Sequence, residues 1–288
     1  MVLHLDPPVP PVPWTCPNCR GEVATFFCPD CGERHFSKRE LSLRGLLEQL
    51  LRVFTRVDGR VLRTFMFLLC RPGILTTAFM NGQRKPFIGP FQIFLVANVL
   101  FFAVQSFADM KIFASTLAFR LDGQLWSEFG RQLVTKHLTQ TGYSLEQYAP
   151  IFNQAVALNA KSMIGLMVPL LALLPPLTFW RTSRPLAVHV AFCLHIYAFL
   201  LLLFCVPLAA EIADGALGGD GLMNPHTDDV VSLILLSTCG GYLYCAIGPV
   251  YGARGVLRGL QALVLALATA CIFLVYKFAL LPITLWTT

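Results

Sequence analysis

The stretch LAVHVAFCLHIYAFLLLLFCVPLAA, residues 186–210, is almost entirely apolar and contains no Asp, Glu, Lys or Arg. A helix needs about 20 such residues to cross the hydrocarbon core of a bilayer. The whole chain has the same character, because 56% of its 288 residues are hydrophobic and only 13% are charged. A soluble domain has roughly 25% charged residues. We therefore predict a membrane protein, with residues 186–210 as one of its transmembrane helices.

Four more apolar segments are long enough to cross a bilayer. The predicted spans are residues 87–107, 161–180, 186–210, 230–251 and about 260–286. We expect Pro169, Pro175 and Pro176 to kink or shorten the second span, because proline interrupts helical hydrogen bonding. The sequence thus predicts an all-α polytopic membrane protein with about five transmembrane helices, in a transmembrane domain over residues 86–288. A four-span arrangement, with the last segment in the membrane interface, is the alternative.

The distribution of Lys and Arg predicts the orientation of these helices. Cytosolic loops of membrane proteins are enriched in Lys and Arg. Twelve basic residues lie before the first span, and the short connections after the second and fourth spans carry two arginines each. With five spans, all of these charges fall on one side of the membrane, and the predicted loops 108–160 and 211–229 fall on the other. We therefore predict a multi-pass protein with a cytosolic N-terminus and an external C-terminus.

The chain opens with MVLHLDPPVPPVPWT. Prolines interrupt every apolar run in it, so it does not resemble a secretory signal, and we expect the N-terminus to stay in the cytosol. Residues 1–13 are predicted to form a stiff, extended Pro-rich leader. This leader is either a disordered lead-in or a docking peptide for a cytosolic protein.

Two Cys-x-x-Cys pairs separated by eight residues follow the leader, in CPNCRGEVATFFCPDCGE, residues 16–33. Four thiolates at this spacing can surround one Zn²⁺ tetrahedrally. The candidate metal ligands are Cys16, Cys19, Cys28 and Cys31. Because four cysteines leave no open position, we predict one structural zinc ion per chain, in a small zinc-ribbon or zinc-knuckle module over residues 14–36.

Two other interpretations of the cysteine motif have less support. A redox-active pair is expected in a thioredoxin-like βαβ context, which the sequence lacks. His35 is close enough to compete as a ligand, but four cysteines already complete a tetrahedral shell. Gly32 after Cys31 suits the left-handed turn of a knuckle, whereas Arg20 follows Cys19 at the corresponding place. The six remaining cysteines are scattered through apolar sequence, and we predict that they are small buried hydrophobes.

Residues 38–85 are basic and amphipathic. In LSLRGLLEQLLRVFTRV, residues 41–57, apolar side chains recur at helical spacing and arginines follow another face. The arginines of this face and of the next segment are Arg44, Arg52, Arg56, Arg60 and Arg63. We predict interfacial amphipathic helices whose arginines bind anionic lipid headgroups. A solvated stem packed beneath the spans is an alternative that is compatible with this one. Arg71-Pro72-Gly73 is expected to break the helix.

Polar side chains within the predicted spans are candidate functional residues, because polar groups are costly in lipid. These residues are Asn98, Gln105, His189, His195 and Tyr244. They either line a pathway or form hydrogen bonds between helices. His189 and His195 are six residues apart and therefore lie on different faces of one helix, which makes them a poor metal-binding pair. Gly248 and Gly252 would permit close contact with another helix.

Catalysis has little support from the residues. The spans contain no Ser-His-Asp set, no phosphate-binding loop and no carboxylate pair. Their interiors also lack Asp and Glu, which weakens the case for a proton-coupled or cation-coupled transporter. No catalytic residue is therefore predicted.

Several segments have a familiar pattern: CPNC with CPDCG, DGRVLRTFMFLLCRPG, NGQRKPFIGPFQIFLVANVLFF, HVAFCLHIYAFLLLL and YLYCAIGPVYG. Together they resemble a bacterial family known as domain of unknown function 3667. The resemblance implies a zinc-ribbon-like N-terminus joined to a multi-span region in the bacterial inner membrane. It implies no activity.

Three functions fit these features. The first, which we favour, is a permeation, transport or lipid-handling pathway formed by a homo-oligomer, with the zinc module as a cytosolic brace or gate. The second is an adaptor whose leader and zinc module recruit a cytosolic protein partner. The third is an intramembrane enzyme that uses His189 and His195, and no nearby carboxylate supports it. Nucleic-acid binding is disfavoured, because the arginine stripe has too much apolar periodicity to be a free basic surface.

Overall fold

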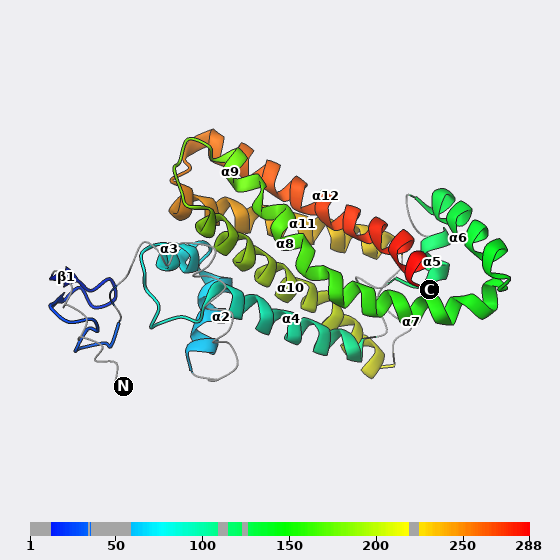
Figure 1. Ribbon diagram of the computed structural model, residues 1–288, viewed down its shortest axis with the longest axis horizontal. Helices are drawn as coiled ribbons and strands as arrows, with labels where there is room; N and C mark the ends of the chain where they lie inside the picture. Colours follow the sequence, from blue (N-terminus) through cyan, green and yellow to red (C-terminus); the bar gives the residue numbers. More distant parts are fainter. Residues whose placement is uncertain (1–12, 34, 36–58, 109–114, 123–125, 219–224) are drawn as a thin grey trace, which may run out of the picture.

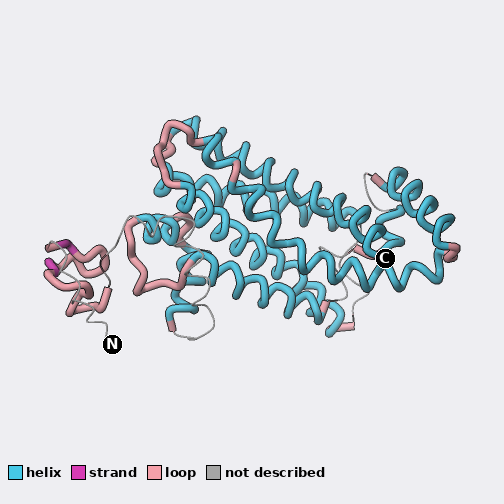
Figure 2. Tube along the Cα trace, viewed as in Figure 1, coloured by secondary structure: helices cyan, strands magenta, loops and turns pink. Residues whose placement is uncertain are grey.

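The computed structural model describes residues 13–33, 35, 59–108, 115–122, 126–218 and 225–288. Helices account for nearly all of the regular structure in these residues, as Figures 1 and 2 show. Five helical segments are long and apolar enough to cross a membrane. They are Pro90–Phe107, Leu145–Thr178, Leu186–Ala216, Val230–Tyr251 and Gly255–Thr287. The prediction of an all-α membrane protein with about five transmembrane helices is confirmed.

The core of the bundle is helix α10, Leu186–Ala216. In its apolar window 61% of the residues are buried, against 28–39% in the other four segments. Its most extensive partner is α4, Pro90–Phe107, which lies beside it in Figure 1. A helix that is apolar on all sides and buried on most of them is a core helix, which is why this stretch has no polar face.

The second span begins earlier than predicted, at Leu145 instead of residue 161. Ser144 caps it: its hydroxyl accepts the Gln147 N–H, and the Gln147 side-chain oxygen accepts the Ser144 N–H. This reciprocal pair satisfies two backbone donors at the helix start. The span is then fragmented, as its prolines predict. Its parts are α7 (Leu145–Met163), the 3₁₀ helix η2 (Ile164–Leu166), α8 (Met167–Ala172) and α9 (Leu174–Thr178).

The predicted external loop 108–160 is not an irregular segment, because most of its described residues are helical; its position outside the membrane stays a prediction. The helical residues form α5 (Leu117–Asp122), α6 (Ser127–Thr141) and most of α7. The buried residues of α7 recur every four positions: Tyr148, Phe152, Val156 and Ala160. This stripe faces α12, Gly255–Thr287. The polar composition that indicated a loop belongs to the opposite, exposed face of α7.

Three of the helical segments are longer than a bilayer requires. Leu145–Thr178 has 34 residues, which is about 50 Å of helix, whereas the hydrocarbon core is about 30 Å thick. Part of this segment therefore extends beyond the lipid. Helix α6 precedes this segment in the chain and packs against α12, where Phe129 stacks on Phe278. Figure 1 shows α5 and α6 beside the C-terminus, at the end of the bundle away from the N-terminal module.

Helices α2 (Arg60–Cys70) and α3 (Ile74–Met80) form a bent pair with an angle of 119° between them. Arg71-Pro72-Gly73 is the turn, as predicted. Gly73 has a φ of 82° and lies against α11, Pro225–Tyr251, where an added Cβ would come within 2.5 Å of the Ala246 carbonyl oxygen. The pair is either a broken span or a re-entrant hairpin. Figure 1 shows both helices at the end of the bundle nearest the N-terminal module.

The N-terminal module contains a short antiparallel pair of strands, β1 (Trp14–Thr15) and β2 (Glu22–Val23), with Trp14 opposite Val23. The predicted Pro-rich leader, apart from Pro13, and the predicted helix with Arg44, Arg52 and Arg56 lie outside the described residues. Arg60 is half-buried and Arg63 is exposed on α2. The lipid-headgroup role of these arginines stays a prediction.

Candidate metal centre and polar contacts between the helices

The two Cys-x-x-Cys turns have the same backbone structure. In the first turn the Arg20 N–H donates to the Cys16 carbonyl, and in the second the Gly32 N–H donates to the Cys28 carbonyl, both at 2.8 Å. The N–H of the first cysteine in each turn also donates to the carbonyl five residues later, at 2.8 and 2.7 Å. Two equivalent knuckles therefore face each other. Figure 1 shows the module as a compact unit outside the helical bundle.

The structure brings the four predicted ligands together. The sulfur atoms of Cys16, Cys19, Cys28 and Cys31 all lie within 4.8 Å of one another. The shortest separations are 3.4 Å between Cys19 and Cys28 and 3.5 Å between Cys16 and Cys31. Four sulfurs bound to one zinc ion at about 2.3 Å are about 3.8 Å apart. The cluster therefore has the size of a tetrahedral four-thiolate metal site.

Arg20 takes the place of a knuckle glycine and adopts its conformation. Its φ is 64°, against 66° for Gly32, and among the described residues it is the one non-glycine with a positive φ. This left-handed conformation costs an L-residue roughly 1–2 kcal/mol. The fold of the first turn therefore depends on the hydrogen bonds around the cysteines rather than on the preference of residue 20.

The thiols of the metal-free cluster differ in acidity. The Asn18 side chain and the Glu33 backbone hydrogen-bond to Cys31 and lower its pKa to about 7. At Cys19 the Gly21 backbone lowers the pKa, but the Cys28 thiol, burial and the other two thiols outweigh it and raise the pKa to about 12. A metal must therefore displace protons from the cluster when it binds.

The module is attached to the loop between α3 and α4. One oxygen of the Glu33 carboxylate accepts the backbone N–H groups of Arg84 at 3.2 Å and Lys85 at 3.0 Å. Glu33 is 1% exposed. The Gln83 side-chain amide donates to the Pro17 carbonyl at 2.7 Å. The first knuckle thus makes one hydrogen bond to this loop and Glu33, after the second knuckle, makes two, so the cysteine module is attached to the membrane domain.

The role of Glu33 could not be predicted from its neighbours in the chain. Glu33 follows the second knuckle directly, but its partners lie about fifty positions further along the chain. The other neighbour, His35, packs edge-on against Trp14 at 5.1 Å and is not part of the metal cluster. It is therefore not a rival ligand in this structure.

The two predicted histidines lie on α10 and have separate partners. His195 Nδ1 and the Thr76 hydroxyl of α3 are 2.8 Å apart, and both residues are buried. His189 Nδ1 and the Tyr251 hydroxyl of α11 are 2.9 Å apart, with the two rings stacked. The histidines therefore connect α10 to two different elements, and the structure does not bring them together in one site.

The other predicted polar residues also do not converge. Asn98 is half-buried and Gln105 is 8% exposed, both on α4. Tyr244 is 43% exposed, and its ring lies beneath the Arg258 guanidinium, 4.3 Å from the ring centre. Gly252 follows the end of α11 with a φ of 71° and has open surroundings, whereas Gly248 lies against Arg258 of α12. Of the two glycines, only Gly248 therefore makes the close helix contact that we predicted.

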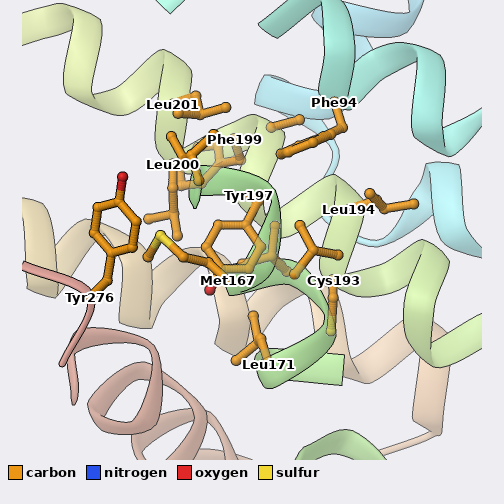
Figure 3. Packing of buried hydrophobic residues seen from close by; sticks show 14 of the residues in the cluster. Phe94, Met167, Leu171, Cys193, Leu194, Tyr197, Phe199, Leu200, Leu201 and Tyr276 are labelled. Carbon is orange, nitrogen blue, oxygen red and sulfur yellow. The ribbon is translucent and has the colours of Figure 1, made fainter. Parts of the chain in front are cut away.

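Tyr197 was missed by sequence reasoning. Its hydroxyl is buried on α10 and has no hydrogen-bond partner in the described structure. Figure 3 shows it in the packed cluster with Met167 and Leu171 of α8, where the second span is fragmented. Buried hydroxyls normally have a partner. The one sequence signal for a functional role was its position two residues from His195. An apolar run, however, does not show whether the hydroxyl of a tyrosine has a hydrogen-bond partner.

These features define a polytopic helical membrane protein with a four-cysteine module attached to it. Residues 58–102 match the model of a family described as "Protein of unknown function (DUF3667)". The match covers 45 of the 288 residues, and the matched segment contains the bent pair α2–α3, the loop that holds the metal module and most of α4. No curated protein and no solved structure shows significant similarity to the chain.

Proposed function

We propose that this protein forms a transport pathway across a bacterial plasma membrane, along the core helix α10. The observation that carries the proposal is that both interrupted helical elements, α2–α3 and α7–α9, pack against α10. Interrupted helices are tolerated in membranes where they are enclosed by protein or border a water-filled cavity. In many transporters they form the substrate site near the middle of the bilayer.

The bent pair α2–α3 is the proposed gate. It meets α10 through the buried contact between Thr76 and His195. It also meets α11, where the Tyr242 hydroxyl donates to the Leu68 carbonyl at 2.9 Å. A hydrogen bond between membrane helices contributes about 0.6 kcal/mol on average. Such contacts are strong enough to favour one position of the hairpin and weak enough to be exchanged during transport.

The second interrupted element supports the same location. Helix α8 packs on α10 near Tyr197, whose buried hydroxyl lacks a partner. A hydroxyl of this kind is available to a substrate or a water molecule. His195 and Tyr197 are two residues apart on α10 and therefore project in different directions, toward the two interrupted elements.

The arginine-containing connections support a cytosolic N-terminus. Those between α9 and α10 and between α11 and α12 lie at the end of the bundle nearest the metal module, as Figure 1 shows. They carry Arg181, Arg184 and Arg254 and no acidic residue, and Arg258 follows in the first turn of α12. This arrangement fits the enrichment of Lys and Arg in cytosolic loops.

We also propose that the four cysteines hold one structural zinc ion. Thiolate ligands and tetrahedral geometry favour zinc, and a four-thiolate shell leaves no position for a substrate. The ion would hold the two knuckles together, and Glu33 would transmit that order to the loop that follows α3. In this proposal the module braces the gate. The alternative of a freely displayed adaptor has less support, because both knuckles contact the membrane domain.

Flux measurements on proteoliposomes test the pathway. The probes are protons, K⁺, Cl⁻ and a fluorescent phosphatidylglycerol, each measured with the wild-type chain. We expect flux of at least one probe, and a change of about threefold in its rate for Thr76→Val, which removes the bond to His195. Absence of flux for all four probes would count against the proposal.

Thr269→Val is the matched control for this substitution. Thr269 is also buried in a predicted span, but its hydroxyl donates only to the Leu265 carbonyl of its own helix, at 2.7 Å. The control should leave the flux unchanged. Equal effects of the two substitutions would show that the Thr76–His195 contact has no special role.

A further inference from the structure

An apolar groove of about 420 Å³ lies between α11 and α12. Its lining is almost entirely apolar, with Ser237 and Tyr244 as the polar contributors. The neighbouring side chains of α12, Leu260, Leu263 and Leu267, are more than half exposed. In a membrane helix such a surface faces lipid, so the groove opens toward the bilayer rather than toward water. Its volume is in the range of small-ligand sites, about 300–1,000 Å³.

The groove exists because small residues leave space that the protein does not fill. Glycines between membrane helices usually allow the backbones to approach closely. Here a Cβ added to Gly241 or Gly259 would meet nothing within 4 Å, and one added to Gly240 would meet only the Ala266 methyl at 3.9 Å. The glycines therefore leave an open groove between α11 and α12 instead of bringing the two helices into close contact.

Arg258 lies at one end of the groove, next to Gly259 and over the Tyr244 ring. Its Nε donates to the Tyr244 carbonyl at 2.7 Å and its Nη2 to the Cys245 carbonyl at 3.2 Å. The Cys245 carbonyl has no helical partner, because the residue four positions later is Pro249, which lacks an N–H.

Gly248 makes room for this guanidinium, since a Cβ there would come within 2.7 Å of Arg258 Nη2. Arg258 is thus held in place by backbone contacts and keeps further N–H groups for an anion. Residues 252–261 around Arg258 contain no acid. The positive end of the groove is the end proposed to face the cytosol, where bilayers carry anionic lipid.

We propose that this groove is a binding site for an anionic phospholipid. One acyl chain lies along Gly240, Gly241 and Gly259, and the phosphate pairs with Arg258 at the membrane surface. Charge and shape agree on this occupant: the groove is apolar within the bilayer and cationic at its interface. The site does not depend on the transport proposal, because α2–α3 and the metal module are not part of it.

Native mass spectrometry of the full chain in detergent tests the proposal, with added phosphatidylglycerol or phosphatidylcholine as probes. We expect one retained phosphatidylglycerol per chain and weaker retention of phosphatidylcholine. Gly241→Leu places a side chain in the groove at a position where an added Cβ meets nothing within 4 Å, and it should weaken retention about tenfold. Arg258→Gln removes the charge and should weaken it about fivefold. Arg258→Lys keeps the charge and should retain most of the binding.

Two control variants make the result specific. Gly165→Leu places the same side chain at another glycine with open surroundings, in the second span and outside the lining of the groove. Arg254→Gln removes a neighbouring exposed charge. Both should bind phosphatidylglycerol like the wild type. A wild-type level of binding by Gly241→Leu, or an equal loss in Gly165→Leu, would overturn the proposal.

Two further outcomes would also contradict it. Equal retention of the two phospholipids by the wild type would indicate nonselective surrounding lipid rather than an anion-selective site. A change from dimer to monomer in Gly241→Leu, with lipid retention unchanged, would show that a second copy of the chain occupies the groove.

Discussion

At the scale of single residues, the candidate metal centre depends on four clustered cysteines and on the left-handed backbone of Arg20. The four cysteines were recognisable because metal ligation needs particular atoms at particular spacings, and the structure places their sulfurs within 4.8 Å of one another. The sequence showed that Arg20 departs from the glycine pattern of a knuckle, but it did not show which backbone conformation Arg20 adopts. Arg20 adopts the left-handed conformation of Gly32, since the hydrogen bonds of the knuckle compensate for the strain.

Metal analysis of the purified chain tests the assignment of the cysteines. We expect about one zinc per chain in the wild type and almost none in Cys28→Ser, because a three-thiolate remainder holds the ion weakly. Cys245→Ser removes an exposed cysteine outside the cluster and should leave the zinc content unchanged. A wild-type protein without zinc, or a Cys28→Ser variant that keeps it, would contradict the structural zinc site.

At the scale of elements, local signals located most helices and helix breaks. The prolines of the second span and the turn at Arg71-Pro72-Gly73 act on their own neighbourhood, so they were predictable. The start of α7 was misplaced although its capping box at Ser144 was visible, because the mixed charges of residues 108–160 outweighed the stripe of apolar residues. The stripe from Tyr148 to Ala160 has helical spacing and was the signal that we overlooked.

The turn between α2 and α3 has a specific requirement for glycine. Gly73→Ala would combine a positive φ with a Cβ within 2.5 Å of the Ala246 carbonyl oxygen. We expect it to destabilise the protein by about 2–4 kcal/mol, measured as a lower midpoint of thermal unfolding in detergent. Gly165→Ala, at a glycine with no close neighbour, is the control and should melt near the wild type. Similar melting of the two variants would show that the turn tolerates a side chain.

At the scale of the whole molecule, the positions of Lys and Arg and the lengths of the apolar segments led to the predicted topology. Five helices of sufficient length and the clustering of arginine connections near the metal module agree with a five-span topology. Figure 1 shows the N-terminal module and the C-terminus at opposite ends of the bundle. The additional pair α2–α3 was not predicted as a possible span, because each half is too short by itself.

Reporter fusions test this topology in a bacterial host. We expect alkaline phosphatase fused after Thr288 to be active, because it folds only on the outer side of the plasma membrane. A fusion within the connection at Arg184 should be inactive, since this connection is predicted to be cytosolic. Activity at Arg184 combined with inactivity after Thr288 would reverse the orientation. Inactivity at both positions would favour four spans.

The sequence by itself determined the class of protein, the four cysteines of the candidate metal centre and the order of the apolar helices. These properties depend on composition and on spacings within about twenty residues, where hydropathy, proline and cysteine act directly. Only the tertiary structure decided the partners: Thr76 for His195, Lys85 for Glu33, and Arg258 for the carbonyl that Pro249 leaves free. In lipid every helix side is apolar, so hydrophobicity does not specify which faces meet, and packing with a few buried hydrogen bonds makes that choice.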